Sequence, residues 1–185
     1  MYKCCTTQAA ARRQRELEEK LEQLLMQRPY DAVSVSGFCV YAEIPRRVFY
    51  RYFTGMEGAL CALLDHTLGE IGWNPRHWQG VPEETLCREL TQMLEGCLRH
   101  RRLFLALAEN HLETHLVRRA LLFLQGGEPE QTRGFCPESG SREELAAVCV
   151  LYTMLAWQRQ EFASPPAEVA RELAHILKTP LSAIS

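Results

Sequence analysis

Residues 33–60, VSVSGFCVYAEIPRRVFYRYFTGMEGAL, form the stretch that decides the fold. Apolar spacing predicts a short helix from about Ser34 to Tyr41. A second short helix opens at Pro45, whose ring fixes φ at a helical value, and continues through Tyr52. Two short helices joined by about four residues form a helix-turn-helix, whose second helix fits the major groove of a duplex.

Longer helices flank this motif. An apolar stripe in the first 28 residues ends near Arg28-Pro29, because proline cannot continue a helix. Thr54 and Glu57 form a capping box that opens the next helix. The two stripes are Leu17, Leu21, Leu24 and Leu25, and then Leu60, Leu63, Leu64 and Leu68.

The rest of the chain is also helical in pattern. Residues 69–80 predict a break, a helix follows Pro82, and the apolar series 103–124 divides near Glu109-Asn110. Residues 126–141 are rich in Gly, Pro and Glu and predict a mobile loop. The sequence therefore predicts an all-α chain. Its expected parts are a three-helix helix-turn-helix domain at 1–55 and a helical domain at 56–185, with last helices at about 141–162 and 164–178.

Composition excludes several classes of protein. The chain has 185 residues, a net charge of -2, 46% apolar and 24% charged residues, so it is neither a disordered tail nor a low-complexity chain. Its longest apolar run, Leu145–Trp157, is too short to span a bilayer, and the first 30 residues contain no secretory signal. We therefore expect a cytoplasmic protein with no membrane partner, whose eight cysteines are reduced and mostly small core residues.

The charge is uneven. Residues 1–60 contain nine Lys or Arg against seven Asp or Glu, whereas residues 61–185 contain twelve against sixteen. The N-terminal end is therefore the better candidate for a polyanionic partner. In a helix that opens at Pro45, Arg46 and Arg47 fall in the first turn, where they can reach phosphates or base edges. The alternative for these arginines is an ordinary solvated face.

The whole pattern closely resembles the DNA-binding domain of TetR-family transcriptional regulators. The similar segments are residues 30–35 (YDAVSV), 42–45 (AEIP) and 49–53 (FYRYF), followed by Glu57 and Leu60. The resemblance implies a ligand-responsive regulator, a repressor that a small-molecule effector releases from its double-stranded DNA operator. The alternative is a helical dimeric ligand-sensing or interaction protein that has lost DNA binding. The residues expected to contact DNA are Ser34, Ser36, Pro45, Arg46, Arg47, Tyr50, Arg51 and Tyr52.

Three positions depart from the family pattern. Glu43 replaces the usual glycine of the turn, Pro45 replaces a Ser or Thr cap, and Met56 replaces a phosphate-binding lysine. Together these changes weaken the electrostatic part of DNA affinity. The cations that could compensate are Lys3, Arg12 and Arg13.

The resemblance also implies a homodimer and an effector pocket. In such a dimer the last two helices pair with those of a second copy. These helices have more apolar residues than packing within one small domain requires, and a second copy would bury the excess. The predicted interface is Leu145, Val148, Tyr152, Leu155, Leu173, Ile176 and Leu177. Trp157 is either an anchor there or ordinary core. The predicted pocket lining is Trp73, Trp78, Phe104, Leu107, His111, His115, Leu116 and Phe123.

A metal site is the main competing interpretation. His111 and His115 are four residues apart in HLETH, a spacing that places them on one helical face, with Cys97 and His100 one helix earlier. However, Glu113 lies on a different face, unlike the glutamate of a zinc protease motif. No phosphate-binding glycine loop or nucleophile motif stands out either. We therefore predict no enzyme, no cofactor and no structural metal.

Overall fold

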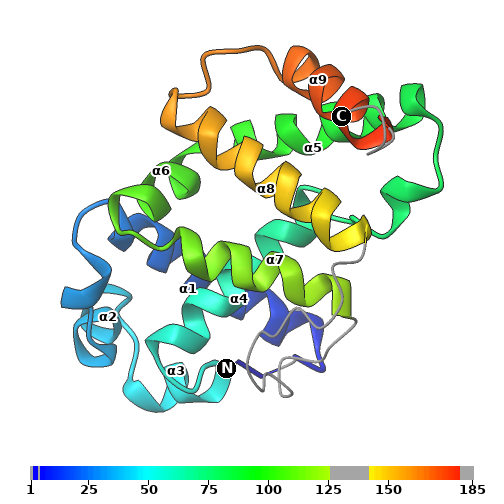
Figure 1. Ribbon diagram of the computed structural model, residues 1–185. Coiled ribbons are helices and arrows are strands. Elements are labelled where there is room, and N and C mark those ends of the chain that lie inside the picture. The colour runs from blue at the N-terminus through cyan, green and yellow to red at the C-terminus, as the bar shows by residue number, and fades with distance from the viewer. Residues whose placement is uncertain (1, 4, 126–141, 180–185) are drawn as a thin grey trace. The chain divides into compact units, whose positions relative to one another are not determined.

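The computed structural model describes residues 2–3, 5–125 and 142–179 (Figure 1). Within these ranges the chain is helical and contains no strand, which confirms the all-α prediction. Two short 3₁₀ helices, η1 (Tyr30–Ala32) and η2 (His77–Gln79), interrupt the series. The α-helices are α1 (Gln8–Leu25), α2 (Val35–Tyr41), α3 (Arg46–Tyr52), α4 (Met56–Glu70), α5 (Glu83–Arg99), α6 (Arg101–Glu109), α7 (Glu113–Gln125), α8 (Arg142–Arg159) and α9 (Pro166–Lys178).

The chain divides into two compact units. The first comprises residues 1–67 and 102–119, and the second comprises 68–101 and 120–185. The first unit thus contains all of the predicted helix-turn-helix domain, most of α4, and a later segment formed by most of α6 and half of α7. The units do not follow the expected boundary at residue 55. That boundary concerns function, and it stays a prediction.

An aromatic cluster holds the helix-turn-helix together. Phe38 of α2 and Phe49 of α3 are fully buried, with ring centroids 5.6 Å apart, and Phe53 lies 5.3 Å from Phe49. The predicted α1 stripe is buried as well, and α2 packs against both α1 and α3 (Figure 1). Each buried phenylalanine contributes about 1.5–3 kcal/mol of transfer free energy, so these rings fix how α3 is presented.

The end of α6 is tied to the end of α1 through one side chain. The side-chain oxygen Oδ1 of Asn110 accepts a hydrogen bond from the Tyr30 backbone N–H at 2.6 Å. Its amide group donates to the carbonyl oxygens of Leu25, at 3.1 Å, and Ala106, at 2.7 Å. Burial, with smaller contributions led by the charge of Glu57, raises the pKa of the neighbouring Tyr30 phenol to about 12. The segment from Arg102 therefore completes the first unit rather than merely following it.

The second unit is built around tryptophans and the α5–α9 pair. Trp73 and Trp78 are 4% and 3% exposed, and their rings meet edge to face at 5.1 Å. The Trp73 indole N–H donates to the Ala120 carbonyl at 2.9 Å. α9 packs chiefly against α5, and at Gly96 of α5 an added Cβ would lie 3.1 Å from the Ile71 backbone. A glycine there allows the close approach.

The predicted limits of α2 and α3 agree with the structure to within one residue, but α1 ends at Leu25, three residues before Arg28, and α8 ends at Arg159, before the predicted residue 162. The break after α4 begins at Ile71, two residues later than predicted, and includes η2.

Only two of the six described cysteines, Cys39 and Cys97, are buried, so the expectation that most are core residues is wrong. All six are free thiols. The predicted loop at 126–141 lies outside the described residues.

No helix in the described part of the chain is both long and apolar enough to cross a membrane.

Candidate nucleic-acid interface

Local hydrogen bonds shape the turn between α2 and α3. Ser34 caps α2, its hydroxyl accepting the Gly37 N–H at 3.1 Å, as a helix N-cap does. After α2, the Ile44 N–H donates to the Cys39 carbonyl at 3.0 Å. Between them Glu43 has φ of +56°, in the left-handed region that glycine prefers. Glu43 therefore takes a backbone conformation that a glycine would adopt at lower cost.

The outward side of α3 is basic and aromatic. Pro45 lies at the N-cap, one position before the helix, and has no side-chain capping bond. Arg46, Arg47, Tyr50 and Arg51 are exposed, while Val48 is half-buried. Because Phe49 is fully buried on the opposite side, the exposed residues project from a rigidly seated helix.

Tyr52 is among the residues predicted to contact DNA, but the structure buries it. Its side chain is only 6% exposed and packs 6.2 Å from the Phe53 ring. Tyr50, in contrast, is 47% exposed. Tyr50 therefore lies on the surface of α3, and Tyr52 lies in the core.

The two arginines of the first turn differ in their surroundings. The Arg46 guanidinium donates to the Ser36 hydroxyl of α2, which holds it across the turn. Arg47 has no side-chain partner among the described residues, and neither does Arg51. Ser36 was predicted as a DNA contact, but nothing in the sequence pattern signals its bond to Arg46, because the pair spans ten positions and two helices.

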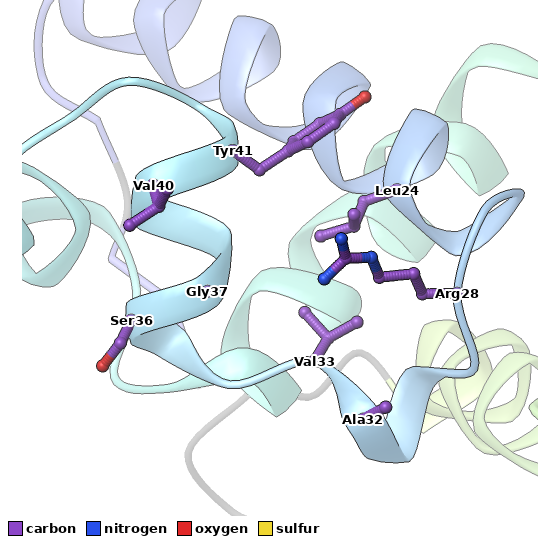
Figure 2. Close-up of a pocket in the computed structure, with 8 residues that line it drawn as sticks. All are labelled: Leu24, Arg28, Ala32, Val33, Ser36, Gly37, Val40 and Tyr41. Atoms are coloured by element: carbon purple, nitrogen blue, oxygen red, sulfur yellow. The ribbon is translucent and has the colours of Figure 1, made fainter.

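A groove of about 430 Å³ lies beside α2 (Figure 2). Figure 2 shows the Arg28 guanidinium between the side chains of Leu24 and Val33, with the Tyr41 ring pointing away from them. A second hollow, about 440 Å³, lies between α2 and the start of α3. Val40, which is 80% exposed, borders both. Neither hollow is formed by residues predicted for the effector pocket.

The structure distributes the predicted pocket residues between the two units. Trp73 and Trp78 belong to the second, and both are core residues. The remaining described members belong to the first, and the Phe123 side chain lies outside the described residues. In the first unit Phe104, Leu107 and Leu116 are buried, His115 is half-buried and His111 is exposed.

His111 and His115 do not share a helical face. α7 begins only at Glu113, and His111 sits in the preceding turn with φ of +54°. Cys97 is 1% exposed, and burial raises the pKa of its thiol to about 12. His100 lies 3.1 Å from a Glu70 carboxylate oxygen. Among the residues the structure describes, no group of three or more His, Cys, Asp or Glu could hold a metal ion.

The predicted dimer face is largely on the surface. Tyr152 of α8 is 67% exposed, and Ile176 of α9 is 55% exposed. Leu145 and Val148 are about half exposed, whereas Leu155 and Leu177 are half-buried. Leu173 is the exception, because at 1% exposure it packs inside the second unit and presents no surface. Trp157 is 3% exposed, which agrees with its reading as ordinary core.

Comparison with known proteins gives matches in structure alone. No protein-family model and no curated protein sequence matches the chain. The fatty acid degradation regulator FadR from Bacillus halodurans superposes with a TM-score of 0.59 at 13% identity, covering 91% of this chain and 95% of that one. A TetR-family transcriptional regulator from Streptomyces coelicolor gives 0.51 at 21% identity, covering 90% and 79%. The TetR-family repressor AlkX from Dietzia sp. strain DQ12-45-1b, implicated in n-alkane biodegradation, also gives 0.51 at 21%, covering 88% and 93%.

The chain has the fold of TetR-family regulators. α3 spans the residues that the sequence predicted as the second helix of the helix-turn-helix. At 13–21% sequence identity these neighbours establish the fold and nothing about individual side chains. The exposed arginines of α3 are therefore interpreted from this chain alone.

Proposed function

We propose that the chain is a DNA-binding transcriptional regulator, a homodimeric repressor that a small-molecule effector releases from its operator. One observation supports this above the others. α3 presents Arg46, Arg47, Tyr50 and Arg51 outward from a fully buried phenylalanine cluster. Rigid presentation of arginines on a helix that fits a major groove is what sequence-specific recognition requires.

The two first-turn arginines take different parts in this proposal. Arg47 has no partner among the described residues, so its planar guanidinium is available for bidentate contact with a guanine edge. Arg46 is held by Ser36 toward α2, the helix that lies beside the backbone in this motif. We therefore expect Arg47 to read a base and Arg46 to contact a phosphate.

The experiment begins with DNA sequences selected in vitro by the purified full chain. On the selected operator, Arg47→Ala should weaken binding by about 1–3 kcal/mol and flatten the preference at one base position. Arg46→Ala should weaken all sequences alike and lower the slope of log K against log salt by about one. Arg88→Ala is the matched control, since Arg88 is an exposed arginine of α5 in the other unit.

A second function stays open because of Glu43. Its exposed carboxylate adds an anion beside the arginine face, in a turn whose backbone it strains. If neither arginine change alters DNA binding while the circular dichroism spectrum stays native, the helix-turn-helix does not recognise DNA and any binding measured is non-specific. The chain is then a helical dimeric ligand-sensing or interaction protein whose helix-turn-helix has lost DNA binding. As a regulator it would act in the cytoplasm, and neither function requires a cofactor or a membrane.

The dimer and the effector belong to the second part of the proposal. The exposed apolar residues of α8 and α9 would be covered by the same helices of a second copy. Effector binding would change the separation of two recognition helices that must match successive major grooves about 34 Å apart. The names of two structural neighbours, a fatty acid degradation regulator and a repressor implicated in n-alkane biodegradation, suggest an apolar effector as the first class to screen.

A further inference from the structure

Two residues at the beginning of the chain fold back onto the end of α3. Tyr2 forms an isolated antiparallel bridge with Phe53, and the Lys3 N–H donates to the Tyr52 carbonyl at 2.9 Å. The arm formed by Tyr2 and Lys3 is therefore fixed to the residues that close the recognition helix.

A buried ion pair anchors this arm. The Tyr2 hydroxyl donates to Asp65 Oδ2 at 2.8 Å, and Arg119 Nε donates to Asp65 Oδ1 at 2.6 Å. Asp65 is 8% exposed and Arg119 is 11% exposed. Burial alone would lower the pKa of Arg119, but the hydrogen bond and charge of Asp65 outweigh burial and raise it. Arg119 therefore stays charged beside Asp65, and the same Asp65 carboxyl group accepts the Tyr2 hydroxyl.

The arm places a cation beside the arginine face. Lys3 is exposed, and its Nζ lies 3.2 Å from the Tyr50 carbonyl oxygen, within the last turn of α3. The outward residues of that turn are Tyr50 and Arg51. A solvent-exposed ammonium group can exchange a carbonyl contact for a phosphate oxygen, which offers a full negative charge.

We propose that Lys3 is a phosphate-binding residue that the anchored arm holds against the operator backbone. It supplies the cation that Met56 does not supply at the start of α4. This inference rests on the proposed function, because its ligand is a backbone phosphodiester of duplex DNA. Tyr2 is a positioning residue, since it acts through the arm and not on the phosphate.

The competing role for Lys3 is structural. A lysine near a helix C-terminus also stabilises the helix by donating to its last carbonyls. The two roles have different measurements, because a cap changes thermal stability whereas a phosphate contact changes the salt dependence of DNA binding.

The experiment measures log K against log salt for the full chain on a short random-sequence duplex. Lys3→Ala should lower the slope by about one and weaken all sequences alike, and Lys3→Arg should preserve the slope. Lys20→Ala, which removes an exposed lysine of α1, is the matched control and should leave the slope unchanged. The double variant Met56→Lys with Lys3→Ala should restore the wild-type slope of log K against log salt. Tyr2→Phe should weaken binding without changing the net charge.

The outcomes separate this inference from the function on which it rests. If the wild type binds DNA and Lys3→Ala has the same slope as Lys20→Ala, the phosphate role of Lys3 is wrong while the proposed function stands. The same holds if Lys3→Ala lowers only the melting temperature. If the wild type shows no salt-dependent binding to any duplex, the proposed function fails and the role of Lys3 fails with it.

Discussion

Glu43 shows how one residue can affect both stability and binding. A non-glycine residue in the left-handed region is destabilised by contact between its Cβ and the following carbonyl, at about 1–2 kcal/mol. Glu43 adopts φ of +56° there, and its carboxylate is exposed beside a face that would attract phosphates. The strain comes from the backbone and the electrostatic effect from the side chain, so substitution can separate them.

We predict that Glu43→Gly stabilises the fold by about 0.5–1 kcal/mol, because relief of strain exceeds the extra freedom of glycine in the unfolded chain. Glu43→Gln keeps the strain and removes the charge, so its free energy of unfolding should be nearly that of the wild type. Both variants should bind DNA more tightly. Urea denaturation and a DNA titration measure the two effects, and a stabilised Glu43→Gln would contradict the backbone explanation.

Residues such as Tyr52 and Ser36 mark the limit of sequence reasoning at this scale. Phe49 and Phe53 are four residues apart, so helical periodicity accounts for their burial on the same side of α3. Tyr52 lies at the edge of that inward stripe, and its burial depends on Phe53 and the closure of α3. The Arg46 bond to Ser36 needs the angle between two helices, which local patterns do not contain.

At the scale of the element, helix ends follow local chemistry while helix partners do not. Ser34 and Pro45 act on their nearest neighbours, so the limits of α2 and α3 were predictable. The proline after Arg28 set only an outer limit for α1, which ends earlier, at Leu25. Contacts such as Asn110 with Tyr30 join residues 80 positions apart. His111 is exposed because it lies in the turn between α6 and α7. The HLETH spacing suggested one continuous helix, but α7 begins only at Glu113.

Asn110→Ala tests the joint between α6 and α1. The change removes one acceptor and two donors, and it leaves the Tyr30 N–H and the Leu25 carbonyl without their partner. Since a buried polar group left without a hydrogen bond costs about 1–3 kcal/mol, we expect a loss of about 2–3 kcal/mol in the free energy of unfolding. Asn74→Ala, at an exposed position in the other unit, should change it by under about 0.5 kcal/mol. Equal losses for the two variants would show that the joint contributes little.

At the scale of the whole molecule, the exposed apolar residues of the second unit are those that the proposed dimer would cover. Leu145, Val148 and Tyr152 recur at three- and four-residue steps along α8, so they lie on one face of that helix. Ile176 extends the exposed apolar set onto α9, which contacts α8. Scattered apolar residues are ordinary on a surface, whereas apolar residues gathered on one helix face fit the dimer contact proposed above. The sequence pattern predicted most of this set, although it could not tell Leu173 from its neighbours, because packing against α5 decides which side of α9 is covered.

Tyr152→Arg tests whether this stripe joins two copies. The purified chain should sediment at micromolar concentration with about twice its mass of 21.2 kDa. Tyr152 is the largest and most exposed member of the stripe, so a two-fold contact would bury two copies of it, and an arginine there would bring like charges into an apolar contact. We expect the variant to sediment as a monomer with a native circular dichroism spectrum and with weaker operator binding, because a single helix-turn-helix contacts only one half-site. Val40→Arg, which places the same charge at an 80% exposed apolar position in the first unit, should leave the sedimentation unchanged. A wild-type monomer, or a Tyr152→Arg variant that still sediments as a dimer, would remove α8 from the interface and with it the dimeric repressor in the form proposed.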